Sequence, residues 1–375
     1  MAEVEIGLGK SGRRAYGFDE LSIVPSRRTR DPEDIVLSWE IDAFSFELPV
    51  IAAAMDGVTS PATAIDVGRL GGVGLLNLEG LWTRYEDPAP LFDEIANLSD
   101  DKVTIRLQEI YREPIKPELV TARLQEIRDA GVVAAGAVTP QRTARLTDAI
   151  IAGEPDLLVI QGTVVSAEHV SKNQDPLNLK TFVRALDLPV LVGGCSSYQA
   201  ALHLMRTGAA GVLVGVGANH ACTGDAILGI GAPQATAVAD VRAARMRHLD
   251  ETGVYCHVIA NGGLRTGGDI AKAIVCGADA VVLGTALAHA AEAPGRGFNW
   301  GNESFHSSLP HGTRIETPAF GTLDEVLFGP DHGGDGRLNL MGALRATMAL
   351  TGYETLKDLQ KADLTIARPD TGGDR

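Results

Sequence analysis

A cysteine on a glycine-rich loop is the most reactive feature of this sequence. The loop runs Gly215-Val-Gly217-Ala-Asn219-His220-Ala-Cys222-Thr223 and directly follows a short apolar run. The N–H groups of such a loop can stabilise a thiolate, which can then attack an electrophilic carbon. A nucleophilic Cys222 and an unreactive loop cysteine both remain open from this pattern alone. His220 either binds phosphate, tunes the thiol or is an ordinary loop histidine.

The other three cysteines fit different roles. Cys256 and Cys276 fall inside a predicted strand and at a predicted helix end, where we expect them to pack as small apolar residues. Cys195 follows Gly193-Gly194 at a strand end, so it could line a pocket without reacting. The sequence has no CxxC pair and opens with no secretory signal. These features predict a reduced, cytoplasmic protein.

Two glycine turns provide the chemistry needed to hold a phosphate. Asn261-Gly262-Gly263 follows one apolar run and Gly284-Thr285 follows the next. Both offer unhindered N–H groups, and the second adds a hydroxyl. The alternative is that these glycines only make tight turns. Glu292, shortly after, is a candidate general acid or base, or else an ordinary solvated carboxylate.

Eight short apolar runs must position these residues. They are rich in β-branched residues without polar alternation, a pattern typical of parallel strands buried on both faces. Helical patterns separate them, so the predicted fold class is an α/β protein with a (β/α)₈ TIM barrel. A doubly wound sheet is the alternative, but its GxGxxG turn is missing after the first strand. The runs are Pro49–Ala53, Gly74–Asn77, Val132–Val138, Leu157–Gln161, Pro189–Gly193, Gly211–Gly215, His257–Asn261 and Ala280–Gly284.

We predict one barrel domain over residues 1–375. A lead-in precedes a core of about 49–295, followed by an active-site flap at 296–336 and a tail at 337–375 that is helical from Leu338 to Gln360. We expect Val103–Ile127 to be helical and broken by prolines, because its apolar positions recur with the helical period; reading Val103–Leu107 as a strand would give nine strands. Pro369–Arg375 are predicted to be disordered.

The charge excludes some partners. The chain carries a formal charge of −15, and its one basic cluster, at Arg27, Arg28 and Arg30, is short. An acidic surface repels nucleic acid and anionic lipid, so we expect neither as a partner. The sequence has no stretch of about 18 uncharged apolar residues that would span a membrane. The remaining histidines lack metal-ligand spacing, and no catalytic metal is predicted.

Several motifs together resemble the IMP dehydrogenase/GMP reductase family over nearly the whole chain. The most specific is the cysteine loop followed by Gly231-Ala-Pro233-Gln234-Ala-Thr-Ala-Val238. Pro49–Thr59, with Met55-Asp56, resembles the first-strand motif of the family, and Arg69–Leu76 resembles the second. Further matching segments are Asn261–Leu264, Asp269–Ala273, Gly284–Gly295, Ala319–Asp324 and Gly336–Gly352. Residues 78–130 occupy the place where the regulatory CBS pair is normally inserted, so no CBS pair is expected.

The resemblance implies covalent catalysis on a purine 5′-monophosphate. Cys222, with Thr223 beside it and Glu292 as acid or base, would act at purine C2, and NAD or NADP would exchange hydride there. Potassium could bind the carbonyls of Gly217, Asn219 and Cys222, and a homotetramer is expected. Gln161 and Cys195 would contact the cofactor. The implied substrate-binding residues are Met55, Gly217, His220, Asn261, Gly262, Gly263, Gly284, Thr285, Phe320 and Gly321.

The chain also departs from the family pattern. Asn261 replaces the aspartate that grips the ribose, Gly224 replaces a threonine, and Gln161, Cys195, His220 and Thr317 replace an aspartate, an asparagine, a serine and a tyrosine. Residues 320–336 lack the Arg-Tyr pair that activates water in the dehydrogenases. These departures favour the reductase direction slightly over the dehydrogenase. A catalytically inactive nucleotide-binding partner and a flavin- or other phosphate-binding barrel remain alternatives.

Overall fold

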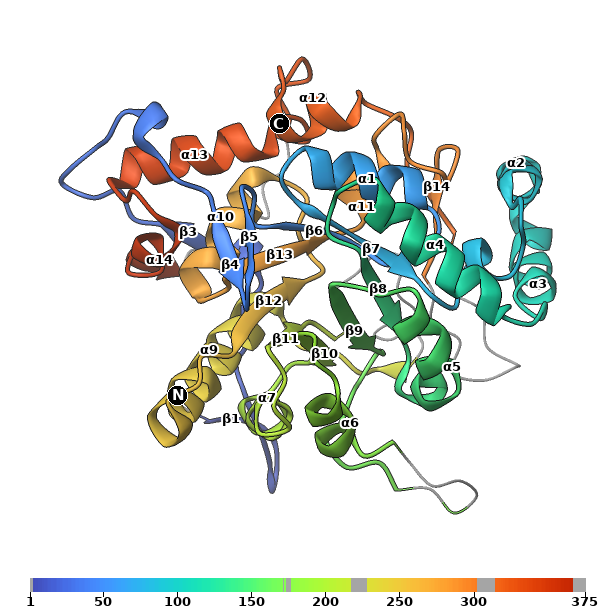
Figure 1. Cartoon of the computed structure of the whole chain (residues 1–375). Coiled ribbons are helices and arrows are strands. Elements are labelled where there is room, and N and C mark those ends of the chain that lie inside the picture. Colours follow the sequence, from blue (N-terminus) through green and yellow to red (C-terminus); the bar gives the residue numbers. More distant parts are fainter. Residues whose placement is uncertain (1–2, 171, 173–176, 217–227, 302–313, 367–375) are drawn as a thin grey trace.

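Eight parallel strands close into a barrel in the computed structural model, which describes residues 3–170, 172, 177–216, 228–301 and 314–366. The order around the barrel is β6-β7-β8-β9-β10-β11-β12-β13, and β13 pairs with β6 to close it (Figure 1). Almost all strand residues are buried, as their unbroken apolar sequences predicted. The predicted TIM barrel is confirmed. The strands are β6 Val50–Ala52, β7 Val73–Asn77, β8 Ala135–Val138, β9 Leu157–Gln161, β10 Val190–Cys195, β11 Gly211–Val214, β12 His257–Asn261 and β13 Ala280–Leu283.

Helices follow the strands and surround the barrel. Several begin at side chains that satisfy the free N–H groups of the first turn, such as Ser60, which accepts from Thr63 N, and Thr266, which accepts from Asp269 N. These helices are α1 Pro61–Arg69, α5 Pro140–Ala152, α6 Leu179–Ala185, α7 Tyr198–Met205, α9 Gln234–Thr252, α10 Gly267–Cys276 and α11 Thr285–Ala288. The tail is helical as predicted, with α13 Leu340–Thr351 and α14 Leu356–Leu359, while α12 Leu323–Phe328 lies within the predicted flap region, where no helix was expected.

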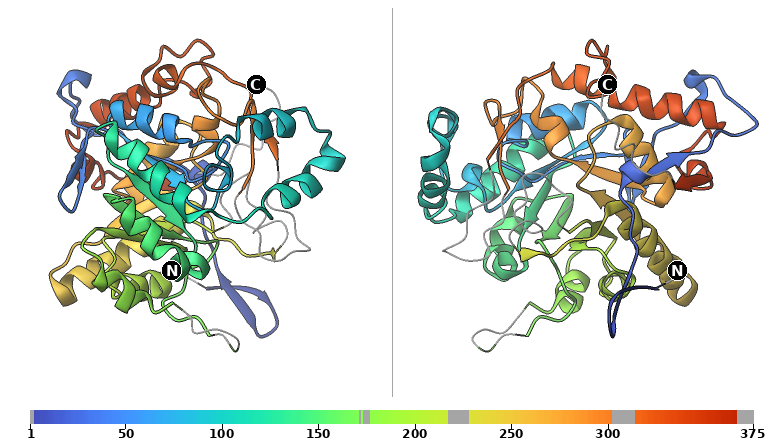
Figure 2. Two further views of the ribbon diagram at one scale, coloured as in Figure 1. Left: turned by 45° about the vertical axis from the view of Figure 1, so that its right-hand side comes forward. Right: turned by 180° about the vertical axis from the view of Figure 1, so that it is seen from behind.

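Short strands and turns flank the barrel. The hairpin of β1 Glu3–Gly7 and β2 Lys10–Arg13 projects away from it (Figure 2). The other pairs are β3 Leu21–Ile23 with β16 Leu364–Ile366, β4 Trp39–Ile41 with β5 Phe44–Phe46, and β14 Phe298–Asn299 with β15 Ile315–Glu316. Single 3₁₀ turns occur at η1 Phe18–Glu20, η2 Pro32–Asp34 and η3 Leu81–Thr83. No helix among the described residues is long and apolar enough to cross a membrane.

Part of the segment between β7 and β8 forms a small unit of its own, while its last helix packs against α1 and α5 in the ring of barrel helices. The segment contains α2 Ala89–Asn97, α3 Asp100–Ile110 and α4 Pro117–Asp129, so the prediction that 103–127 is helical is confirmed. α2 and α3 lie outside the ring of barrel helices (Figure 1). They share a second apolar core with Trp300, which is fully buried. We call residues 81–111 the insertion.

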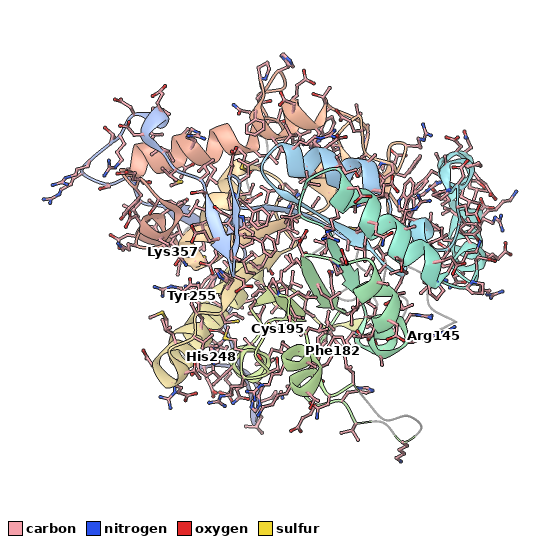
Figure 3. All side chains as sticks on the ribbon, in the orientation of Figure 1. Arg145, Phe182, Cys195, His248, Tyr255 and Lys357 are labelled. Atoms are coloured by element: carbon pink, nitrogen blue, oxygen red, sulfur yellow. The ribbon has the colours of Figure 1, made fainter. Side chains whose placement is uncertain are left out.

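A cluster of charged residues around the buried Asp279 binds the tail to the amino-terminal end of the barrel. Asp279, just before β13, accepts hydrogen bonds from Arg245 Nη1 of α9 at 2.9 Å and from Val258 N of β12 at 2.8 Å. Lys357 of α14 pairs with the same carboxylate and lies over the ring of Tyr255 (Figure 3). Burial alone would raise the pKa of Asp279, but Arg245 and Lys357 outweigh it and hold this pKa below its usual range.

Removing Asp279 should therefore strongly destabilise the fold. Asp279→Ala leaves the buried Arg245 guanidinium uncompensated, so we expect the free energy of unfolding to fall by about 3–5 kcal/mol. Urea denaturation measures this change. Glu126→Ala, which breaks an exposed pair with Arg123, is the matched control and should change stability little. A similarly small fall in the free energy of unfolding for both variants would contradict a stabilising role of Asp279.

Candidate active site

The described part of the predicted site gathers at the carboxyl-terminal ends of the strands. Asn261 ends β12, Gly284 follows β13, and Met55 lies on the turn after β6. In barrels of this type that end carries the active site. Five predicted residues, namely Gly217, Asn219, His220, Cys222 and Thr223, lie outside the described residues, so their roles stay predictions.

The glycine turns lie side by side because β12 and β13 are neighbours in the barrel, with Asn261 opposite Val282. Gly262 and Gly263 have φ angles of +101° and +74°, a backbone conformation that residues with side chains rarely adopt. At Gly284 the constraint is space, because a Cβ there would lie 3.1 Å from the sulfur of Met55. Gly284 also begins the first turn of α11, which contains Thr285. Three strand ends thus meet around a surface of main-chain groups.

Gln234 ties two of these strand ends together. It is the first residue of α9 and only 4% exposed. Its Nε2 donates to Val214 O of β11 at 2.6 Å and lies 3.3 Å from Asn261 O of β12. Gly215 passes so close that a Cβ would come within 1.9 Å of Asn261 O. Gln234 therefore fixes the start of the cysteine loop, at Gly215, relative to the end of β12. The sequence motif contains Gln234, but nothing else in the sequence indicates this role.

Comparison with known proteins settles the family. The model of the IMP dehydrogenase / GMP reductase domain matches residues 15–314, which include the whole barrel. The chain belongs to the IMP dehydrogenase/GMP reductase family. The crystal structure of an IMP dehydrogenase/GMP reductase-like protein from Corynebacterium glutamicum superposes with a TM-score of 0.92, at 42% identity and covering 97% of each chain.

Within the family, two degrees of similarity are evident. Uncharacterized oxidoreductases of Mycobacterium tuberculosis and Mycolicibacterium smegmatis are 50% and 49% identical, each match covering 97% of this chain and 99% of the relative. The inosine-5′-monophosphate dehydrogenase of Methanocaldococcus jannaschii is 26% identical, covering 95% of this chain and 93% of that one. The chain is thus an oxidoreductase-family member nearer to the first group than to this dehydrogenase.

Glu292 and Phe320 lie at one side of this end. Glu292 is exposed, and its Oε2 accepts from Leu323 N at 2.7 Å, at the amino terminus of α12. Phe320 stacks on His289, with ring centroids 4.1 Å apart, and the Arg337 guanidinium lies 5.0 Å from its ring centre. Gly321 O accepts from Ala291 N at 2.8 Å. The segment that contains Phe320 and Gly321 is thus held against the residues after α11, while the predicted acid–base role of Glu292 stays a prediction.

The two predicted cofactor contacts differ in accessibility. Gln161, at the end of β9, is half-buried. Cys195, at the end of β10, is 2% exposed with its thiol 3.6 Å from Leu213 O, and burial raises its pKa to about 12. The thiol is therefore protonated at neutral pH, consistent with an unreactive residue. Whether either residue contacts a nicotinamide stays a prediction. The packing of Cys256 and Cys276 in the interior is confirmed.

A buried carboxylate next to Met55 was missed by the sequence reasoning. Asp56 is fully buried; its Oδ2 accepts from Leu81 N at 3.1 Å and from the hydroxyl of Tyr111. Trp300 Nε1 donates in turn to the Tyr111 oxygen at 2.9 Å. Burial raises the pKa of Asp56 to about 6, because the hydrogen bonds from Tyr111 and Leu81 and the charge of Arg84 offset the loss of hydration only in part.

This raised pKa should make stability depend on pH. Between about pH 4 and 6 folded Asp56 binds a proton more tightly than the unfolded chain does, so its contribution to stability is lost as pH rises through 6. Asp56→Asn keeps an acceptor oxygen and removes the titration. Relative to the wild type, we expect it to gain about 1–1.5 kcal/mol in the free energy of unfolding between pH 5 and pH 8.

Urea denaturation at the two pH values measures the difference. Asp187→Asn, which replaces an exposed carboxylate, is the control and should follow the wild type. Parallel pH profiles for Asp56→Asn and the wild type would contradict a raised pKa.

Proposed function

We propose that this protein is an oxidoreductase acting on a purine 5′-monophosphate, IMP or GMP, through a covalent adduct between Cys222 and purine C2. The reductase direction is favoured. The observation that carries the proposal is that Gly262-Gly263 and Gly284-Thr285 follow neighbouring strands and that Gly284 lies against Met55, because this arrangement combines main-chain amides with an apolar side chain. A phosphate and a base need those two environments. NAD or NADP is the proposed cofactor, potassium a proposed ligand, and a homotetramer the proposed assembly.

In the reductase direction the proposed steps balance as follows. The Cys222 thiolate forms a bond to C2 of GMP, and the bond from C2 to the 2-amino group breaks to release ammonia. C2 then accepts hydride, the C2–S bond breaks with its electron pair returning to sulfur, and IMP is released. A reduced nicotinamide would supply the hydride when bound, and half-buried Gln161, at the end of β9, is proposed to contact it. Glu292 would transfer a proton to the leaving amine.

The chain's own residues give the adduct its position. The amides of Gly262, Gly263, Gly284 and Thr285 would hold the phosphate, so that main-chain N–H groups rather than a basic side chain face the negative charge. Asn261 would bind the ribose as a neutral partner, and Met55 would pack on the base. Gln234 would keep the Asn261 carbonyl and the start of the cysteine loop in register.

One further candidate is a catalytically inactive, nucleotide-binding partner of a family enzyme. The replacements at Asn261, Gln161 and Gly224 support it, since each removes a group that the family motif places in the reacting centre. This candidate keeps the nucleotide cradle and dispenses with Cys222.

Intact-mass measurement separates the two. Wild-type protein incubated with a purine 5′-monophosphate that carries a leaving group at C2 should gain the mass of one nucleotide less that group, and Cys222→Ala should gain nothing. Cys276→Ala, which changes a buried thiol at the end of α10, is the control and should still be labelled. GMP with NADPH, and IMP with NAD, are then assayed for turnover. Nucleotide binding with neither labelling nor turnover would favour the inactive partner.

A further inference from the structure

We propose that Tyr111 is a positioning residue for the purine site: its hydroxyl, held between Trp300 and Asp56, fixes the turn that presents Met55. The inference rests on the proposed function, in which Met55 packs on the purine. Tyr111 lies at the carboxyl-terminal end of α3, in the insertion rather than in the barrel. The insertion would therefore act on substrate binding from outside the ring of strands.

The turn after β6 is fixed at its base by its own backbone. Met55 O accepts from Val58 N and Thr59 N, each at 2.8 Å, and Thr59 Oγ1 donates to Ala53 O at 2.7 Å. Asn299 Nδ2 lies 3.9 Å from the Met55 sulfur. Asp56 is the residue of this turn whose side chain reaches the insertion, where it binds Leu81 and Tyr111.

The Asp56 carboxylate has little freedom within its pocket. Gly80 packs against it so closely that a Cβ at position 80 would lie 2.0 Å from Asp56 Oδ1. The hydrogen bonds from Leu81 N and from Tyr111 both end on Oδ2, one from each end of the insertion, and the Asn77 side chain of β7 also faces the carboxylate. The charged group facing it from the segment after η3 is Arg84, whose guanidinium lies 5.7 Å from the centre of the Tyr111 ring. The Tyr111 hydroxyl thus supplies a directional contact to a carboxylate that is confined elsewhere by packing.

The insertion is anchored independently of Tyr111, so its hydroxyl can be removed without detaching it. Arg314 Nη1 donates to Ile95 O at 2.7 Å and to Leu98 O at 2.9 Å, at the carboxyl-terminal end of α2. Trp300 is buried in the core of the insertion together with Phe92. Trp300 directly follows β14 and Arg314 directly precedes β15, so the chain on each side of this strand pair is joined to the insertion. Tyr111→Phe therefore tests the hydroxyl rather than the fold.

The first measurement is amide hydrogen exchange without nucleotide. Tyr111→Phe should raise exchange in peptides covering residues 53–59 by about fivefold or more, because the turn loses its link to the insertion. Tyr85→Phe is the matched control: it removes a tyrosine hydroxyl that donates to Ile110 O at 2.9 Å in the same insertion but does not touch Asp56. It should leave residues 53–59 unchanged. Unchanged exchange in Tyr111→Phe, or an equal rise in both variants, would overturn the proposal.

The second measurement is the affinity for IMP and GMP. Tyr111→Phe should weaken binding about five- to tenfold in protein that still unfolds cooperatively, with some loss of thermal stability because the buried Trp300 Nε1 loses its acceptor. An ionised Asp56 accepts a stronger hydrogen bond from Tyr111 than a protonated one does. Wild-type affinity for the nucleotide should therefore fall between pH 8 and pH 5, and this fall should be about threefold larger than the fall for Asp56→Asn. Because the phosphate of the nucleotide titrates equally in both measurements, its effect cancels in the comparison.

The outcomes separate the two proposals. Raised exchange with unchanged nucleotide affinity and identical pH profiles would overturn a role in positioning substrate. If the wild type binds neither nucleotide, the proposed function fails, and exchange alone decides whether Tyr111 fixes the turn.

Discussion

Closure of the barrel by the β13–β6 pairing is the constraint on which the site depends. Val281 lies opposite Val50, and Leu283 lies opposite Ala52, so strands from the two ends of the barrel sequence become neighbours. This register sets Gly284 beside the sulfur of Met55, and the pairing of β12 with β13 places Gly262 and Gly263 after the strand that neighbours β13 on its other side. Each of these turns taken alone is an ordinary loop. They lie at one site only because the closed sheet makes their strands neighbours.

Two buried aspartates show how the two ends of this barrel differ. Asp279, at the amino-terminal end, is surrounded by Arg245, Lys357 and the backbone N–H of Val258, and its pKa lies below the usual range. Asp56, at the carboxyl-terminal end, is equally buried but receives hydrogen bonds mainly from neutral groups, and its pKa rises to about 6. At the amino-terminal end, the ionised Asp279 is compensated by cations and stabilises the fold. At the carboxyl-terminal end, Asp56, whose pKa lies nearer to neutral pH, is next to Met55, the residue proposed to contact substrate.

The sequence allowed the strands, most helices and the glycine turns to be predicted, because each depends on a local pattern. Unbroken apolar runs identified the eight barrel strands, and the helical period between residues 103 and 127 was correctly distinguished from a ninth strand. The Asp56 network could not be found in this way. Tyr111 is 55 residues from Asp56, and Trp300 is 189 residues from Tyr111, so only the packing of the insertion brings them together. Gln234 stood within a recognised motif, but its bridge between two strand ends depends on the finished barrel.

A crystal structure of the protein with GMP bound would test the central claim most directly. The account predicts the phosphate within about 3 Å of the amide nitrogens of Gly263, Gly284 and Thr285, with the purine against Met55. A phosphate bound elsewhere, with these turns open to solvent, would contradict the claim that barrel closure builds a mononucleotide site.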